Sequence, residues 1–239
     1  MKSSAALSNK FEFNVAKLER ETLNDSAYLE LKKAIMSGAI RPGAKITIRA
    51  MAAALGISPM PVREALRRLV AEQALVMLPT RSVSVPLMTS QQFDEICWIR
   101  VALEGRVTEA AAKLISSEDL RVMQQAHAEM SRLKPQDTAE YLARNQQLHF
   151  TLYRAGRMPV ALKIIESLWL QVGPLLNLAL SEFGFRTGQD HHRELLEALA
   201  KRSFKGARSA IEADITDAAR VIREFLDSRQ PPPGERDAP

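Results

Sequence analysis

Two prolines, Pro59 and Pro61, constrain this chain most, because they stand inside a segment that otherwise has the apolar spacing of a helix. A proline in a helix interior removes a backbone hydrogen bond and clashes with the carbonyl four residues earlier. In the first turn neither loss arises, because the first N–H groups of a helix have no partner within it. The prolines therefore predict a helix that begins at Pro59, with Ser58 as N-cap residue, and runs to about Glu72.

Another helix precedes this one at a short distance. It is predicted from about Ile48 to Ala54 with Thr47 as N-cap residue, and Gly56 can supply the left-handed backbone that ends helices. Only residues 56–58 separate the two helices, which is the spacing of a helix-turn-helix motif. The second helix of such a motif enters the major groove of DNA, although an ordinary pair of packed helices has the same spacing.

The distribution of charge favours DNA binding. Residues 1–88 carry thirteen Lys and Arg against seven Asp and Glu, whereas residues 89–239 carry twenty against twenty-one. A basic excess in the segment that holds the motif is typical of a phosphate-binding surface. Arg63 is the strongest candidate, because it lies one turn into the second helix, where side chains reach base edges. For Arg67 and Arg68 an ordinary solvated face is an equal alternative.

Composition indicates the fold class and the compartment. Hydrophobic residues make up 46% of the 239 residues, aromatic residues only 5%, and ten residues are glycine, which favours a mainly helical chain of two domains. The single Cys97 cannot form an intramolecular disulfide. Charged and amide residues interrupt the most apolar stretch, 161–180, and no signal peptide is recognised. We therefore expect a cytoplasmic protein that does not enter the membrane.

The chain divides into four expected segments. Residues 1–20 have no pattern and are expected to form a mobile arm, and residues 231–239 a disordered tail. Residues 21–88 hold a support helix, the helix pair and two β-prone runs around Pro79–Arg81, which predict a winged helix-turn-helix. Residues 89–230 predict an all-helical bundle. Its helices are expected at 90–115, 117–133, 138–155, 159–180, 189–201 and 204–226, with Thr89, Ser117 and Ser203 as N-cap residues.

The segment RPGAKITIRAMAAALGISPMPVREALRRLVAEQALV, followed by PTRSVSV, resembles the winged helix-turn-helix of the GntR family of bacterial transcription regulators. Its most distinctive part is the run Pro-Val-Arg-Glu-Ala-Leu at 61–66. The resemblance implies that Arg49 and Arg63 bind DNA with help from Arg81 in the wing. It also implies that Ser58 offers its hydroxyl where the helix meets a phosphate. The DNA-binding candidates are therefore Arg49, Ser58, Arg63, Arg67 and Arg81.

Two positions depart from the pattern of this family. Pro59 stands where some members have a base-reading arginine, so the base pairs that are read stay open. Gln73 stands where the family often has glycine.

Histidines are the informative residues of the second domain. Asn145 and His149 share one helix face, four residues apart, while His192 and Asp214 lie on the two later helices. All of these residue types can ligate a metal ion. A histidine on an apolar helix face is more often a hydrogen-bonded core residue, so the residues alone leave both interpretations open.

The order of these segments resembles the FCD domain, the helical effector-binding domain of the FadR branch of GntR regulators. In many members an Asp and a His four residues apart and two later histidines bind a divalent metal ion. The resemblance implies a zinc or nickel site formed by Asn145, His149, His192 and Asp214. Asn145 replaces the usual Asp and Asp214 the usual third His, while His191 is expected to point away from the site. Imidazole protonation near its ordinary pKa of about 6.5 is expected to release the metal.

Arg100 is the candidate for effector binding. It shares a helix face with Ile96, Leu103 and Val107, and the resemblance implies an arginine directed at the ligand there. A guanidinium can pair bidentately with a carboxylate effector. The alternative is an ion pair with Glu104, four residues further on, on a partly exposed face. Core or interface positions are predicted for Cys97, Trp98 and Trp169.

Together the motif and the resemblance imply a homodimeric transcription regulator, a repressor rather than an activator. Each recognition helix would read one half of a palindromic DNA operator, and a small organic acid would release the protein. A helical-bundle metalloenzyme with a basic N-terminal domain is the alternative, but neither Glu-x-x-His pairs nor HExxH occur. A nonspecific nucleic-acid packaging protein would leave the second domain without a role.

Overall fold

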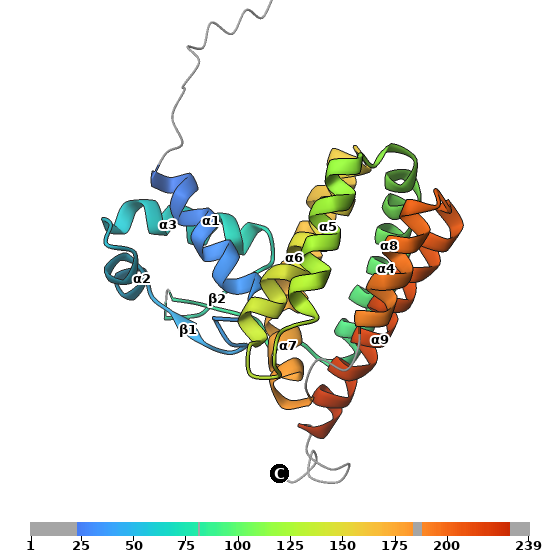
Figure 1. Cartoon of the computed structure of the whole chain (residues 1–239). Helices are drawn as coiled ribbons and strands as arrows, with labels where there is room; N and C mark the ends of the chain where they lie inside the picture. Colours follow the sequence, from blue (N-terminus) through green and yellow to red (C-terminus); the bar gives the residue numbers. More distant parts are fainter. Residues whose placement is uncertain (1–22, 81, 184–187, 230–239) are drawn as a thin grey trace, which may run out of the picture.

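The computed structural model describes residues 23–80, 82–183 and 188–229, which form two lobes (Figure 1). The head consists of α1 (Leu23–Met36), β1 (Lys45–Ile46), α2 (Ile48–Leu55), α3 (Pro59–Ala71), β2 (Val76–Met77) and β3 (Val83–Ser84). The helical lobe consists of α4 (Ser90–Leu114), α5 (Ser117–Met130), α6 (Thr138–Ala155), α7 (Pro159–Phe183), α8 (Gln189–Ala200) and α9 (Phe204–Ser228). The expected arm at 1–20, the expected tail at 231–239 and Arg81 lie outside the described residues.

The head has the predicted winged helix-turn-helix arrangement. Its sheet has the antiparallel order β1-β3-β2, in which Ile46 and Met77 both pair with Val83. The Thr47 hydroxyl accepts a hydrogen bond from the Ala50 backbone N–H at 3.2 Å, and Gly56 ends α2 with a φ of 66°, both as predicted. α1 packs across α3 and supports it from behind.

The first turn of α3 accommodates both prolines as predicted, at its first and third positions. Ser58 is the N-cap residue with an extended backbone, but its hydroxyl makes no capping hydrogen bond. An N-cap side chain ordinarily binds the second or third N–H of the helix, and Pro61 has no N–H at the third position. The Ser58 hydroxyl, which is exposed, is therefore not used by its own helix.

The caps of the helical lobe follow the prediction in part. Thr89 forms a capping box with Gln92, whereas Ser117 was expected as the N-cap residue of α5 and is instead its first helical residue. Ser116 is the cap, because its hydroxyl accepts from the Asp119 N–H and the Asp119 carboxylate reaches back to the Ser116 N–H. Ser203 occupies the N-cap position of α9 without a side-chain hydrogen bond.

In the helical lobe, α9 lies along α4, α6 along α5, and α8 between α5 and α9 (Figure 1). α7 contacts α4, α6 and α9 and also α1 of the head. Residues 159–182 of α7 are long and apolar enough to span a membrane, but more than half of their most apolar window is buried inside the molecule. One apolar cluster runs from Ile35 and Leu69 in the head through Ile165 of α7 to Leu152 of α6.

Two of the predicted core or interface residues differ in burial. Trp169 of α7 is buried in the core, whereas Trp98 of α4 is 74% exposed, so a core position for Trp98 is wrong. Cys97, beside it, is partly buried.

Candidate functional site

The outward face of α3 carries the basic residues predicted to bind DNA. Arg63 and Arg67 are exposed, while Val62 and Leu66 on the opposite face are buried in the head. Arg49 is exposed on α2. Arg63, Arg67 and residues of β1, β2 and β3 line a groove of about 410 Å³ between the helix and the wing. Arg49 and Arg63 have no ion-pair partner among the residues that the structure describes.

The other arginines of α3 are engaged within the head. Arg67 binds Glu64 at 2.9 Å on the exposed face. Arg68 lies 3.7 Å over the ring of Tyr28 and binds Glu72 at 3.3 Å, while the Tyr28 hydroxyl donates to Glu72 at 2.8 Å. Arg68 therefore fastens α3 to α1. Arg63 is the arginine of α3 without an ion pair among the described residues, and Arg67 stays exposed beside Glu64.

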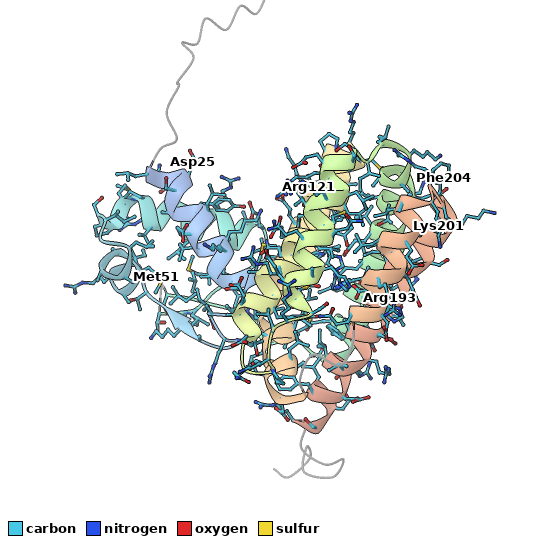
Figure 2. All side chains as sticks on the ribbon, viewed as in Figure 1. Asp25, Met51, Arg121, Arg193, Lys201 and Phe204 are labelled. Atoms are coloured by element: carbon cyan, nitrogen blue, oxygen red, sulfur yellow. The ribbon has the colours of Figure 1, made fainter. Side chains whose placement is uncertain are left out.

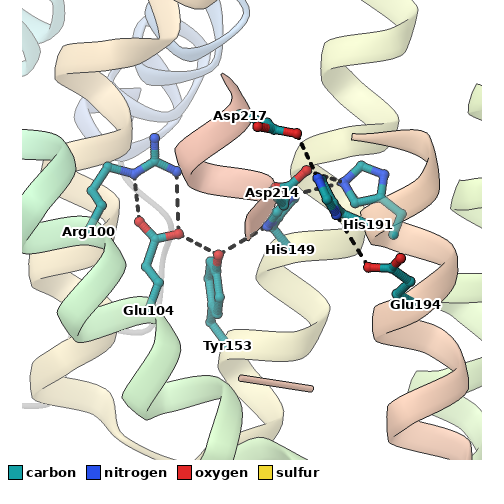
Figure 3. Close-up of polar contacts among 9 residues, drawn as sticks. Arg100, Glu104, His149, Tyr153, His191, Glu194, Asp214 and Asp217 are labelled. Atoms are coloured by element: carbon teal, nitrogen blue, oxygen red, sulfur yellow. Dashed lines mark hydrogen bonds and ion pairs between the residues drawn. The ribbon is translucent and has the colours of Figure 1, made fainter. Parts of the chain in front are cut away.

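Three predicted metal ligands from three helices meet in the interior of the helical lobe. His149 of α6 is 1% exposed, His192 of α8 is fully buried, and Asp214 of α9 is nearly so. The two histidine Nε2 atoms lie 3.2 Å apart. The Asp214 carboxylate lies 3.3 Å from the Nε2 of His149 and 3.4 Å from that of His192. Figure 3 shows His149 and Asp214 converging from their helices.

These distances fit a divalent metal ion. Two ligands that each lie about 2.0 Å from a tetrahedral zinc ion are about 3.3 Å apart. Gly188 keeps the adjoining space open, because a Cβ there would lie 3.1 Å from Asp214 Oδ1 and 3.6 Å from His192 Cε1, and its φ of +98° favours glycine. Two imidazoles and a carboxylate are a donor set that several divalent transition metals accept, zinc, nickel and iron among them.

Burial sets the protonation of the cluster. It lowers the pKa of His149 well below its ordinary value and that of His192 to about 4, with a smaller contribution from neighbouring positive charge. Burial also raises the pKa of Asp214 to about 7, which Arg100 offsets only in part. The ordinary imidazole pKa of about 6.5 therefore does not apply to either histidine, and the expected release of a metal by acid stays a prediction. Both imidazoles are already neutral, and the carboxyl group is the one that titrates near pH 7.

A second layer of hydrogen bonds orients His149. Its Nδ1 lies 3.0 Å from the Tyr153 hydroxyl, and that hydroxyl donates to Glu104 (Figure 3). Because the tyrosine hydrogen is committed to Glu104, the tyrosine oxygen accepts from Nδ1–H of His149. This assigns the tautomer whose Nε2 lone pair faces His192 and Asp214, as metal ligation requires.

Glu104 is the centre of this layer. It is fully buried and accepts hydrogen bonds from Arg100 Nε at 2.6 Å, from Trp169 Nε1 at 3.1 Å and from Tyr153. The ion pair predicted as the alternative role of Arg100 is thus present, but it is buried rather than partly exposed. The pair uses Nε and Nη2 of Arg100 and does not engage Nη1.

The predicted effector residue and three of the four predicted metal residues share one small cavity. Arg100, Asn145, His149 and Asp214 line it together with apolar residues of α4, α7 and α9, and its volume is about 30 Å³. A water molecule needs about 10–15 Å³, so the cavity holds one or two waters. The structure therefore brings these residues to one place, around a space of very small volume.

Sequence reasoning missed part of this site. Tyr153 lies four residues after His149, so the helical spacing that paired Asn145 with His149 could have found it. Trp169 comes from another helix and gave no local signal. His191 lies apart from the cluster, as predicted, because its ring binds Asp217 at 2.8 Å and Glu194 at 3.3 Å.

α7 connects this site with the head. Beside Trp169 it carries Glu166, which binds Lys32 of α1 at 2.7 Å, and Ser167, whose hydroxyl donates to the Glu72 carbonyl at 3.0 Å. α7 and α1 are in close contact at Gly173, since a Cβ there would lie 2.6 Å from the carbonyl oxygen of Met36 in α1. One helix thus contacts both the buried cluster and the DNA-binding lobe.

Comparison with known proteins decides the family. Residues 23–85 match the bacterial regulatory proteins of the gntR family, and residues 95–217 match the FCD domain. Over 199 residues the chain is 30% identical to the HTH-type transcriptional regulator McbR of Escherichia coli strain K12, across 82% of this chain and 90% of McbR. The chain belongs to the GntR family.

Solved structures and further relatives agree with this assignment. The structure of E. coli McbR/YncC matches with a TM-score of 0.80 and 27% identity, across 86% of this chain and 99% of that one. The HTH-type transcriptional repressor RspR of E. coli strain K12 is 23% identical over 212 residues, across 86% of this chain and 91% of RspR. This GntR regulator thus has the predicted mainly α fold and FCD domain. It is a transcription regulator and not the alternative metalloenzyme.

Proposed function

We propose that this GntR regulator is a cytoplasmic, homodimeric repressor that a small organic acid releases from a palindromic operator. The observation that carries the proposal is that one chain holds exposed basic residues on α2 and α3 and a buried His149–His192–Asp214 cluster, and that α7 connects the cluster with the head. RspR, a relative over most of the chain, is named as a repressor.

In this proposal the head reads DNA with the outward face of α3. Arg63 contacts base edges, while Arg49 and Arg67 contact phosphates. The exposed Ser58 hydroxyl is available for a phosphate because its own helix does not use it. Arg81, which lies outside the described residues, is likewise assigned to the DNA phosphate backbone, from the wing.

His149, His192 and Asp214 would hold a divalent metal ion, zinc or nickel, with Asn145 beside them. The ion would supply a fixed positive charge for a carboxylate effector. Tyr153 and Glu104 keep the His149 ring in the ligating tautomer. Arg100 offers Nη1, the guanidinium nitrogen that its ion pair leaves unused, to the same carboxylate.

The small volume of the cavity supports a mechanism of release. Small-molecule sites measure about 300–1,000 Å³, and the present cavity is about 30 Å³. An organic acid therefore binds only an arrangement in which α4, α6 and α9 stand further apart, and this difference in affinity shifts the equilibrium between arrangements. Trp169 senses the change at Glu104, and Glu166 and Ser167 on the same helix transmit it to the head.

DNA recognition is tested by competition of a selected operator against random DNA. Arg63→Ala should weaken operator binding by about 1–3 kcal/mol and reduce sequence preference, and Arg81→Ala should weaken all sites alike. Arg106→Ala, an exposed arginine of the helical lobe, is the matched control and should bind as the wild type does. Equal specificity ratios for the Arg63 and Arg81 variants would contradict these roles.

The metal site is tested by elemental analysis of protein purified without chelator. His149→Ala should lose the metal and, in a screen of small mono- and dicarboxylic acids, the release from DNA, while its DNA affinity without acid stays near wild type. His191→Ala removes an adjacent imidazole outside the cluster and should keep both. Metal-free wild-type protein, together with a His149→Ala variant that still responds to acid, would show that the cluster is an organic-acid pocket or plain core.

A further inference from the structure

The first turn of the recognition helix is apolar on its outward side. Pro59 and Met60 are both exposed, Met60 to 60%, whereas Pro61 and Val62 are buried against the head. None of these four side chains has a hydrogen-bond donor, and the only acceptor among them is the weak one of the Met60 sulfur. The turn of α3 that would lie deepest in the major groove therefore offers DNA only carbon and sulfur.

The position of Met60, rather than its exposure, makes it informative, since single exposed apolar residues are common on protein surfaces. The N-terminal residues of a recognition helix contact base edges. Met60 precedes Arg63 by three residues and therefore lies on the same side of α3. Both side chains are exposed there, so in the proposed complex they would face the same stretch of DNA.

The backbone of this turn is also poor in donors. Pro59 and Pro61 have no N–H, so Met60 supplies the only amide among the first three residues of α3. Helix N-termini ordinarily bind phosphate through several such groups. What the first turn contributes to recognition is thus the apolar contact of its side chains.

Thymine presents the one apolar group on the major-groove edges of the four bases, its C5-methyl group. We propose that Met60, with the ring of Pro59 beside it, recognises a thymine methyl group next to the base that Arg63 reads. The proposal rests on the proposed DNA-binding function and names its specificity. Three helical residues advance about 4.5 Å, and base pairs are about 3.4 Å apart, so this thymine lies within about two base pairs of the Arg63 contact.

Deoxyuridine gives a direct test, because it differs from thymidine only by the methyl group. The operator half-site is first selected from random DNA with the full-length wild-type protein. Each thymine is then replaced in turn by deoxyuridine, and the Kd is measured by fluorescence anisotropy. One replacement should weaken wild-type binding about fourfold, the effect of one buried methyl group. Met60→Ala should bind the thymine and deoxyuridine operators equally.

Three further variants separate this contact from general effects. Arg63→Ala should keep the deoxyuridine effect while losing its own base preference. Met60→Gln should shift the preference at that position toward adenine, which a glutamine amide binds bidentately. Leu114→Ala, which truncates a 47% exposed residue of the helical lobe, should behave as the wild type does.

The proposal is overturned if no deoxyuridine position weakens wild-type binding, or if wild type and Met60→Ala lose the same factor. In either case specific DNA binding, and with it the proposed function, stands. If the wild type selects no sequence, the proposed function fails and this proposal falls with it.

Discussion

The two lobes of this GntR regulator treat charge in opposite ways. In the head, Arg49 and Arg63 are exposed and have no ion-pair partner among the described residues. In the helical lobe, Arg100 and Glu104 are buried and joined to each other. On its surface the helical lobe pairs charges both within one helix, as Arg121 with Glu118, and between helices, as Arg144 of α6 with Glu129 of α5. Side chains such as Arg121 and Arg193 extend into solvent (Figure 2).

The difference follows from what each lobe is proposed to bind. A surface for DNA needs free cations, because each phosphate contact replaces a counterion rather than a protein partner. A buried site needs its charges paired, because an unpaired charge in the interior is strongly destabilising. The helical lobe should therefore be sensitive to single changes that the head tolerates.

The largest effect is expected for Glu104→Gln. Removal of this carboxylate leaves the Arg100 guanidinium buried without a counter-charge, so the free energy of unfolding should fall by about 3–5 kcal/mol. Glu64→Gln breaks the exposed pair with Arg67 and should change it by less than about 0.5 kcal/mol. Urea unfolding measures both. Similar losses in the two variants would remove the proposed contrast between the lobes.

The next effect concerns Tyr153→Phe. Loss of the hydroxyl removes the acceptor that fixes the His149 tautomer, so metal affinity should fall about 10–100-fold. Tyr28→Phe removes the corresponding hydroxyl of the head, which binds Glu72, and should leave metal affinity unchanged. Titration calorimetry with Zn²⁺ measures both variants. Unchanged affinity for Tyr153→Phe would reduce this tyrosine to a packing residue.

Metal binding by the helical lobe should depend on pH. Without metal, Asp214 has a pKa of about 7, so at lower pH a metal ion has to displace its proton. Metal affinity should therefore fall about tenfold between pH 8 and pH 6, and the neutral His149 and His192 add nothing to this slope. Asp214→Asn should bind metal more weakly but without the slope. A slope retained in this variant would assign the proton to another group.

The smallest effect is expected in the head, at Gln73. This residue has a φ of 61°, a conformation that is strained for a side chain with a Cβ. Gln73→Gly relieves the strain but increases the entropy of the unfolded chain, so the net gain should be about 0.5 kcal/mol. Ala53→Gly, on the exposed side of α2, should instead destabilise by about 1 kcal/mol. A lower melting temperature for Gln73→Gly than for the wild type would contradict the assignment of backbone strain to this residue.

The head could be predicted almost completely from the sequence, because its signals are local. The prolines at 59 and 61, the glycine at 56 and the cap at Thr47 each act within a few residues, and they placed both helices to within one residue of the structure. Gln73 is a further local case. The frequent glycine at this position of the family is explained by the left-handed backbone that the structure shows there.

The buried site could be predicted only in part. Helical spacing related Asn145 to His149, whereas His192 and Asp214 share no local spacing with them, and the resemblance to the FCD domain was needed to group the four as one site. The role of Trp169, the size of the cavity and the raised pKa of Asp214 depend on how α4, α6, α7 and α9 pack. No local pattern carries that information, which is why the ordinary pKa of imidazole does not apply to His149 and His192.

The unbroken apolar cluster has a consequence for how the molecule comes apart. It joins Ile35 of the head to Leu152 of the helical lobe by way of Ile165. Two lobes with separate cores can melt one after the other, whereas lobes that share a core lose it together. Calorimetry should then show one transition, and a ligand bound in the helical lobe should protect amides of the head from hydrogen exchange. The two lobes thus have different proposed tasks, but they are expected to unfold as a single cooperative unit.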